Sequence, residues 1–139
     1  MAPISAVVIG AGQRGRHVYG RWALDHPDEM RIVAVVDPDP NRRAVFADEH
    51  GISQDHRFDS LKGLTLDIDA AIIATPDRAH HAAAVWAMDA GLHTLLEKPM
   101  TATLEDSLDL VDRAAASKGT VHVGHVLRHT PFFQTVHQI

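Results

Sequence analysis

Three glycines at a fixed spacing constrain this chain more than any other feature. Gly10, Gly12 and Gly15 form the pattern G-x-G-x-x-G directly after an apolar, strand-like run over residues 4–9. The segment from Arg14 to Leu24 is typical of a helix. In such a unit the first glycine permits a tight turn, the second lets the backbone approach a pyrophosphate, and the third lets helix and strand pack. The context favours a dinucleotide site over a simple tight turn, with expected contacts from Gly10, Gly12, Gln13, Arg14 and Gly15.

An acidic residue after the second apolar run supports this interpretation. Residues 31–36 are typical of a buried strand, and Asp37 follows them, about 20 residues after Gly15. An acid there accepts hydrogen bonds from the adenosine ribose and repels a 2′-phosphate, which favours NAD over NADP. NADP stays possible because Arg42 and Arg43 can pair with a 2′-phosphate. The alternative is an ordinary loop aspartate.

Composition excludes several other classes of protein. The 139 residues suit one domain, and 45% hydrophobic with 22% charged content is ordinary for a globular chain. A net charge of -5 disfavours nucleic acid as a partner. The absence of cysteine rules out thiolate sites and disulfides and fits a cytoplasmic location. We expect no membrane partner because no apolar stretch approaches the ~20 residues that span a bilayer.

Histidine is unusually frequent, with 11 residues. His122, His125 and His129 suggest a metal cluster at first sight. In a strand, however, His122 and His125 point to opposite faces, so we expect no metal site.

Strand-like and helix-like segments alternate along the rest of the chain. A weak third strand is expected near Ile52 and a short helical turn over residues 61–64. Further strands are expected over 69–75, 93–98 and 120–126, and helices over 41–49, 78–90, 104–117 and from Pro131 onward. Near-continuous apolar strands separated by helices predict an α/β fold, a Rossmann-type doubly wound parallel sheet in a single domain.

Helix termini carry recognisable signals. Asp77 is expected to cap the helix over 78–90, and Thr103 to open the next helix in a capping-box pattern with Asp106. Leu104, Leu108, Val111 and Ala115 have helical spacing and are expected to form the buried stripe of that helix.

Several polar residues follow the strands at their carboxyl ends, where ligands bind in such sheets. They are Thr75, Pro76 and Asp77 with His80, then Glu97, Lys98 and Pro99, and finally the segment from Gly124 to Pro131. Together with the glycine turn and the run Ala90-Gly91-Leu92-His93, these motifs resemble the Gfo/Idh/MocA oxidoreductase family over essentially the whole chain. The resemblance implies hydride transfer between NAD(P) and a hydroxyl or keto carbon of a sugar, inositol or similar polyol.

The resemblance also implies roles for single residues. Lys98 is placed beside the nicotinamide and the reacting hydroxyl, where it can polarise a carbonyl or share in proton transfer. Glu97 is expected to bond a cofactor ribose hydroxyl, although a solvated acid or a partner of Lys98 is the alternative. Thr75 and Pro76 are expected to line the cofactor by backbone and apolar contact.

Other residues have less defined expected roles. His80 either reaches the site as a catalytic or cofactor-binding residue or only ties its loop together, and His81 is expected to be exposed. Arg14 lies near the pyrophosphate or in solvent. Arg128 is expected on the substrate side, holding a substrate oxygen or carboxylate. The family usually has aromatic residues where this chain has His125 and His129, a departure that affects the substrate side.

The resemblance implies a longer protein. Residues 1–126 are interpreted as the NAD(P)-binding domain, and residues 127–139 as the start of a connection to a missing C-terminal domain for substrate binding and homo-oligomer formation. The fragment alone is expected to be poorly active because the reacting carbon would be poorly held. Two alternatives remain: a stand-alone NAD(H) sensor or assembly module, and an NAD-dependent glycosidase of the same family.

Overall fold

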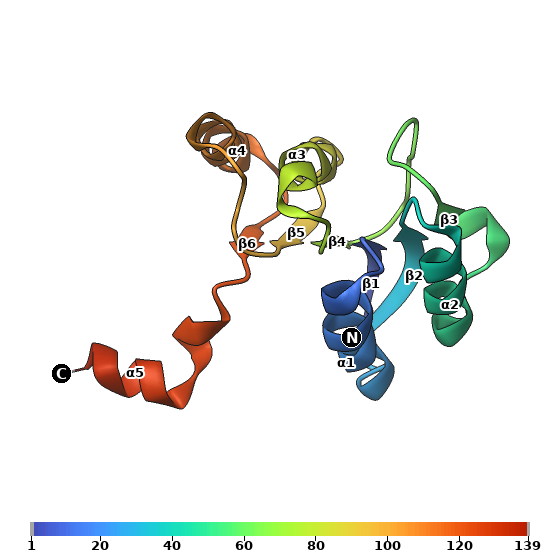
Figure 1. The fold of residues 1–139 in the computed structure, drawn as a ribbon, viewed down its shortest axis with the longest axis horizontal. Helices are drawn as coiled ribbons and strands as arrows, with labels where there is room; N and C mark the ends of the chain where they lie inside the picture. The colour runs from blue at the N-terminus through green and yellow to red at the C-terminus, as the bar shows by residue number, and fades with distance from the viewer. Residues whose placement is uncertain (1, 139) are drawn as a thin grey trace.

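Six parallel strands form one sheet in the computed structural model, which describes residues 2–138 (Figure 1). Their order across the sheet is β3-β2-β1-β4-β5-β6, and each neighbouring pair is parallel. The chain therefore builds outward from β1 in one direction and then from β4 in the other, with the switch point between them. The strands are β1 (Ile4–Ile9), β2 (Met30–Val36), β3 (Arg57–Phe58), β4 (Ala70–Ile73), β5 (His93–Leu96) and β6 (Val121–Val123).

Helices cover both faces of this sheet. Figure 1 shows α3 and α4 on one face and α1 and α2 on the other, while α5 projects away from the sheet. This arrangement confirms the predicted Rossmann-type doubly wound fold. The helices are α1 (Arg21–Asp25), which continues a π-helix over Gly15–Gly20, α2 (Pro40–His50), α3 (His80–Asp89), α4 (Leu104–Ala116) and α5 (Pro131–His137).

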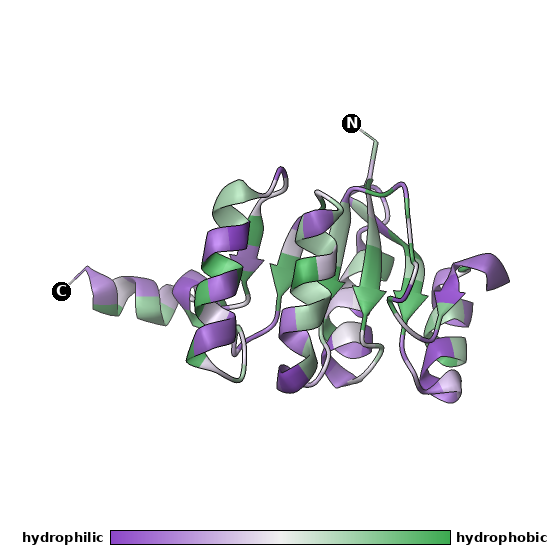
Figure 2. Ribbon diagram, turned by 90° about the horizontal axis from the view of Figure 1, so that it is seen from above, coloured by the Kyte–Doolittle hydropathy of each residue, from purple (hydrophilic) through white to green (hydrophobic). Residues whose placement is uncertain are grey.

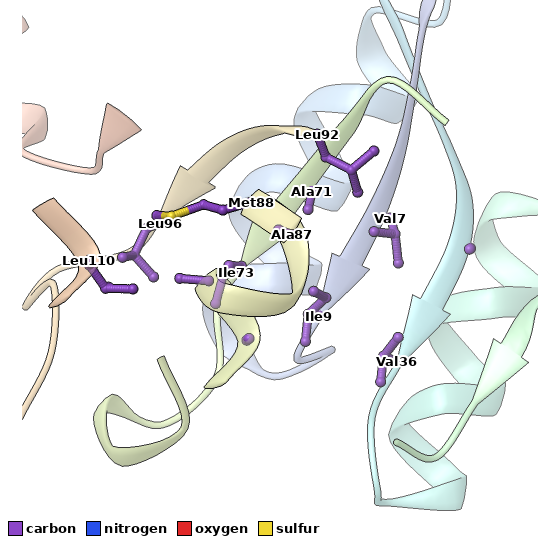
Figure 3. Close-up of a cluster of buried hydrophobic side chains, with 13 residues drawn as sticks. Val7, Ile9, Val36, Ala71, Ile73, Ala87, Met88, Leu92, Leu96 and Leu110 are labelled. Atoms are coloured by element: carbon purple, nitrogen blue, oxygen red, sulfur yellow. The ribbon is translucent and has the colours of Figure 1, made fainter. Parts of the chain in front are cut away.

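The hydrophobic core has two parts because side chains alternate between the faces of a strand. Val7 and Ile9 of β1 point to the face covered by α3 and α4, where they join Ile73 and Leu96 (Figure 3). Ala6 and Val8 point to the other face and pack with residues of α1 and α2, among them the fully buried Phe46. Figure 2 shows the same design as strongly hydrophobic strands between helices of mixed hydropathy. The central strands are thus buried on both sides, as parallel sheets require.

Side chains cap the starts of α2 and α4, and the cap by Thr103 is the expected one. The Asp39 carboxylate accepts hydrogen bonds from the backbone N–H groups of Asn41 and Arg42, so α2 begins at Pro40. The Thr103 hydroxyl accepts from the backbone N–H of Asp106 at 3.1 Å and fixes the start of α4. Both caps satisfy N–H groups that the first helical turn leaves unpaired.

The segment between β2 and β4 departs from the sequence prediction. The third strand was expected near Ile52, but it is the two-residue β3 at Arg57–Phe58, and Ile52 is a buried core residue outside any strand. The helical turn expected over residues 61–64 is a single hydrogen-bonded turn, in which the Leu64 N–H donates to the Leu61 carbonyl. Both errors have one cause: apolar residues here pack as a loop against the core instead of forming regular elements.

The start of α3 also differs from the prediction. Asp77 makes no side-chain cap, because residues 77–79 form a 3₁₀ turn that precedes α3 at His80. His81 was expected to be exposed but is half-buried, with its Nε2 2.7 Å from Asp109 Oδ2 on α4. The imidazole therefore ties α3 to α4.

The predicted buried stripe of α4 is wrong. Leu104, Leu108 and Val111 are 75%, 58% and 56% exposed, and Ala115 is exposed as well, whereas Leu110 is almost completely buried. The helix is rotated so that Leu110 and Ala114 face α3 and the sheet. The most apolar face of α4 consequently lies outside the core.

Among residues 2–138, no helix is both long and apolar enough to cross a bilayer.

Candidate NAD-binding site

In the glycine turn between β1 and the π-helix, two of the three glycines have no space for a side chain. Gly10 has a φ of 96°, and a Cβ on it would lie 2.6 Å from the Ala74 carbonyl oxygen. A Cβ on Gly15 would lie 1.9 Å from the Gly10 carbonyl oxygen. These two positions require glycine for the turn and for close packing.

The second glycine is different because the space around it is open. A Cβ on Gly12 would meet only the Nη1 atom of Arg42, at 4.0 Å, among the described residues. Neither backbone strain nor packing therefore explains a glycine at this position. The space suits a ligand that approaches the backbone closely, and the start of a helix favours negative charge there.

Asp37 lies where the sequence predicts, at the end of β2 beside the glycine turn. It is only 3% exposed. Its Oδ2 accepts a hydrogen bond from the Ala11 N–H and its Oδ1 from the Asp39 N–H, both at 2.8 Å. Asp37 therefore fixes the glycine turn to β2, and each carboxylate oxygen keeps capacity for a second hydrogen bond.

The two arginines that follow Asp37 have partners within the chain. Arg42 Nε lies 3.2 Å from Asp39 Oδ2, and its guanidinium borders the open space at Gly12. Arg43 donates to the backbone carbonyl of Asp37. Of the two, only Arg42 is thus placed beside the expected phosphate position.

A second part of the site lies at the carboxyl ends of β4 and β5. Thr75 and Lys98 line a hollow of about 180 Å³ that reaches Arg14 of the glycine turn. The Thr75 hydroxyl oxygen is buried and has no hydrogen-bond partner among the described residues. Such an orphaned polar atom fits a site that a polar ligand completes. The hollow is lined by Arg14, Ala74, Thr75, Asp77, His80, Glu97 and Lys98.

Glu97 is buried, and each of its two oxygens accepts a hydrogen bond. Oε1 accepts a hydrogen bond from the Tyr19 hydroxyl at 2.6 Å, and Oε2 accepts from the Lys98 backbone N–H at 3.1 Å. Arg14 Nε lies 3.7 Å from Oε1. Burial, followed by the hydrogen bond to Glu97, raises the pKa of Tyr19 well above its ordinary value. Tyr19 is a residue of this site that sequence reasoning missed, since no motif marks it.

His80 is 1% exposed and bridges two backbone segments. Its Nδ1 lies 2.8 Å from the Pro99 carbonyl oxygen and its Nε2 2.9 Å from the Thr75 carbonyl oxygen. Of the two roles considered for His80, these contacts describe the one that ties the loop together, joining the residues after β4 to those after β5.

The structure does not bring every predicted residue to this hollow. Arg128 is exposed and lines a separate hollow of about 670 Å³ with Leu127 and side chains of α5. Pro76 lies at the rim of the β4 end and is exposed, and Gln13 is exposed in the glycine turn. No group of three or more potential metal ligands converges within residues 2–138.

The residues present fit a dinucleotide. Gly12 offers an open backbone beside a helix start, Asp37 lies at the ribose position of such folds, and Thr75 and Lys98 line one hollow. These features lie together at the carboxyl edge of the sheet, on either side of the β1–β4 switch point.

The chain is similar to several known proteins. UDP-N-acetylglucosamine 3-dehydrogenase of Acidithiobacillus ferrooxidans is 33% identical over 94% of this chain and 40% of its own length. A solved structure of that name and source has a TM-score of 0.81 over 99% of this chain and 42% of its own. A glycosyl hydrolase family 109 protein of Shewanella amazonensis is 34% identical over 82% of this chain and 27% of its own length. Inositol 2-dehydrogenase 1 of Saccharopolyspora erythraea is 33% identical over 91% of this chain and 38% of its own length.

The chain thus spans two fifths or less of the length of these curated relatives. The model of the oxidoreductase family with an NAD-binding Rossmann fold matches residues 4–125, which include the glycine turn, Asp37 and Lys98. The family resemblance predicted from the motifs is confirmed, and the chain belongs to the Gfo/Idh/MocA oxidoreductase family.

Proposed function

We propose that this chain is the cofactor-binding domain of an oxidoreductase that transfers a hydride between NAD(H) and a hydroxyl or keto carbon of a sugar, inositol or similar polyol. One observation carries the proposal: the hollow that joins Arg14 of the glycine turn to Thr75 and Lys98. Lys98 lines this hollow, which supports a role for its ammonium group beside the nicotinamide. Relatives named for action on a nucleotide sugar and on inositol support the substrate class.

Each residue of the site has a separate role in this proposal. When bound, NAD supplies the carbon that accepts or donates the hydride. Gly12 leaves the backbone open to the pyrophosphate, and Asp37 holds the turn and accepts from the adenosine ribose. The Lys98 ammonium donates a hydrogen bond to the reacting oxygen, which polarises a carbonyl or takes part in proton transfer. Thr75 completes the cofactor contact with its free hydroxyl.

We propose that NAD is preferred and that NADP is accepted weakly. The buried carboxylate of Asp37 repels a 2′-phosphate. Arg42 borders the same space, but its charge is already paired with Asp39. The Asp39 partner reduces the attraction that Arg42 would otherwise exert on a 2′-phosphate.

We propose that the cofactor domain covers residues 1–126 and that residues 127–139 begin the connection to a further domain. The projection of α5 away from the sheet supports this division (Figure 1), as does the small share of each relative that the chain covers. That domain would supply most of the substrate pocket, with Arg128 on the substrate side. The exposed leucines of α4 support a homo-oligomeric whole protein, and we place it in the cytoplasm.

One rival function has an observation in its favour. The relative from Shewanella amazonensis is named as a glycosyl hydrolase. An NAD-dependent glycosidase would cleave a glycoside without accumulating NADH. A stand-alone NAD(H) sensor is the other rival, and it gives no reason for Lys98 to face the cofactor hollow.

Calorimetric titration of the 139-residue chain with NAD, NADH, NADP and NADPH is the first test. We expect saturable binding of NAD and NADH and weaker binding of the other two. The whole protein is then assayed for NADH formation with inositol, free sugars and nucleotide sugars. NADH formation supports the oxidoreductase, glycoside cleavage without NADH supports the glycosidase, and binding without either reaction supports the sensor.

A further inference from the structure

Tyr19 occupies an unusual position for a side chain of the first helix. It is the only tyrosine in the chain. Its hydroxyl reaches across to Glu97, which follows β5, and donates a hydrogen bond to Oε1 at 2.6 Å. Tyr19 belongs to the π-helix over Gly15–Gly20, a wide helical turn that is rare and is frequently found at functional sites.

Close packing holds this helix in place. A Cβ on Gly15 would clash with the Gly10 carbonyl, and a Cβ on Gly20 would lie 2.8 Å from the Phe46 ring. The two glycines let the π-helix lie directly against β1 and α2. The backbone that carries Tyr19 is therefore held against the body of the domain.

Glu97 links the Tyr19 hydroxyl to the backbone of the next residue, Lys98. Its carboxylate is almost completely buried, and the oxygen that does not bond Tyr19 accepts from the backbone N–H of Lys98. A buried carboxylate needs these donors, because charge without partners is costly in the interior. The peptide group of Lys98 is thereby linked through Glu97 to Tyr19.

Gly124, directly after β6, packs against the hydrogen-bonded pair of Tyr19 and Glu97. A Cβ on Gly124 would lie 3.5 Å from the Tyr19 hydroxyl and 3.6 Å from Glu97 Oε2. Gly124 also donates its N–H to the Leu96 carbonyl at 2.7 Å. The Tyr19–Glu97 pair is thus enclosed by three segments that are distant in sequence.

We propose that Tyr19 is a positioning residue for Lys98 and acts through the carboxylate of Glu97. This inference rests on the proposed function, in which the Lys98 ammonium contacts the reacting oxygen. The hydrogen bonds fix the backbone from which the lysine side chain extends. Each Glu97 oxygen accepts one of these hydrogen bonds, so Glu97 is tied to both Tyr19 and Lys98.

The link between Tyr19 and Lys98 is tested first without substrate. Tyr19→Phe removes only the hydroxyl. In the 139-residue chain we expect it to shift the backbone amide signal of Lys98 in an NMR spectrum and to speed hydrogen exchange there. Thr94→Val is the matched control, since it removes a hydroxyl from β5 whose one hydrogen bond within residues 2–138 goes to the Leu92 carbonyl. An unchanged Lys98 amide in Tyr19→Phe overturns the proposal.

The contact with Glu97 has its own readout, because the near-ultraviolet absorbance of a single tyrosine reports its ionisation. Glu97→Gln should bring the ionisation midpoint of Tyr19 closer to the ordinary range, since the neutral amide attracts the phenol proton less. The amide also offers only one acceptor oxygen to the two donors that Glu97 serves. An ionisation midpoint unaffected by Glu97→Gln would contradict the contact.

The consequence for catalysis is tested in the whole protein. Tyr19→Phe should lower kcat by about 10- to 100-fold, the range expected when a catalytic group is misplaced, with KM for NAD nearly unchanged. In a Lys98→Ala background the same substitution should have no further effect on kcat, because the two residues act in series. Equal losses in both backgrounds would assign Tyr19 a purely structural role.

The two proposals can fail separately. If the amide of Lys98 responds to Tyr19→Phe but the whole protein shows no hydride transfer with any polyol, the proposed function fails and the link stands. If hydride transfer depends on Lys98 but not on Tyr19, the positioning role fails and the proposed function stands.

Discussion

The backbone N–H of Ala11 donates a hydrogen bond to the buried carboxylate of Asp37, with an N–O distance of 2.8 Å. Ala11 lies in the middle of the glycine turn, and Asp37 ends the neighbouring strand. Asp37, which is expected to accept hydrogen bonds from the ribose, thus also fixes the glycine turn that is expected to bind the phosphates. Substitutions at Asp37 should therefore affect both folding and cofactor choice.

Asp37→Ala leaves the N–H groups of Ala11 and Asp39 without their acceptor. We expect the free energy of unfolding to fall by about 1–3 kcal/mol, the usual cost of a buried unsatisfied group. NAD binding should weaken more than NADP binding. Urea unfolding followed by tryptophan fluorescence measures the first effect and calorimetry the second, with the exposed Asp67→Ala as control. A variant with normal stability would show that the two hydrogen bonds contribute little.

Gly12→Ala and Gly15→Ala form a matched pair within one turn. The methyl group on Gly12 enters open space, so the fold should persist, while NADH binding weakens by about 1–3 kcal/mol through overpacking of the occupied site. The methyl group on Gly15 would meet the Gly10 carbonyl oxygen at 1.9 Å. That variant should lose thermal stability before any ligand is added. Thermal melts with and without NADH separate the two cases, and unchanged NADH affinity in Gly12→Ala would argue against a phosphate at this position.

Lys98→Ala should abolish most turnover in the whole protein and leave NAD affinity nearly unchanged. The reason is that its ammonium acts on the reacting oxygen, whereas the cofactor is held chiefly by the glycine turn and Asp37. Steady-state kinetics and calorimetry measure the two quantities, and Lys118→Ala, another exposed lysine, is the control. Parallel losses of turnover and NAD affinity would make Lys98 a cofactor-binding residue instead.

Acidification should destabilise the chain through His50. Burial against Phe46 lowers the pKa of His50 below its ordinary value, because the interior disfavours the charged imidazole. The unfolded chain therefore binds a proton at pH values where the folded chain does not. The free energy of unfolding should fall as pH drops below about 6.5, the ordinary histidine value, and level off below the folded pKa of His50.

The variant His50→Gln isolates this contribution from the other histidines. It removes one titrating group, so the decline in stability below about pH 6.5 should become shallower. Urea unfolding at a series of pH values gives the slope for both proteins. Identical slopes would mean that His50 does not contribute to the acid sensitivity.

The strands and the glycine turn were predictable because their signals are local. Buried parallel strands need continuous apolar runs, and residues 4–9 and 31–36 supply them. The turn at Gly10–Gly15 and the caps at Asp39 and Thr103 depend on residues close together in the sequence. The positions of Lys98 and Thr75 followed from the rule that parallel strands present their carboxyl ends at one edge.

The features that escaped prediction depend on contacts between distant segments. The hydrogen bond from Tyr19 to Glu97 joins the first helix to the end of β5, and no spacing in the sequence announces it. The rotation of α4 is another example, since Leu110 is buried by α3 and the sheet while the more regular stripe at Leu104 and Leu108 remains outside. Helical periodicity identifies an apolar face but not the surface that covers it.

The central place of β1 in the sheet has a consequence for the growing polypeptide on the ribosome. One edge of β1 pairs with β2, which follows it closely in the sequence, but Ala6–Ile9 pair on their other edge with Ala70–Ile73. Until that later strand emerges, the most apolar strand of the nascent chain presents an open edge. Such edges attract other strands, so we expect this chain to be prone to aggregation between translation of β2 and translation of β4.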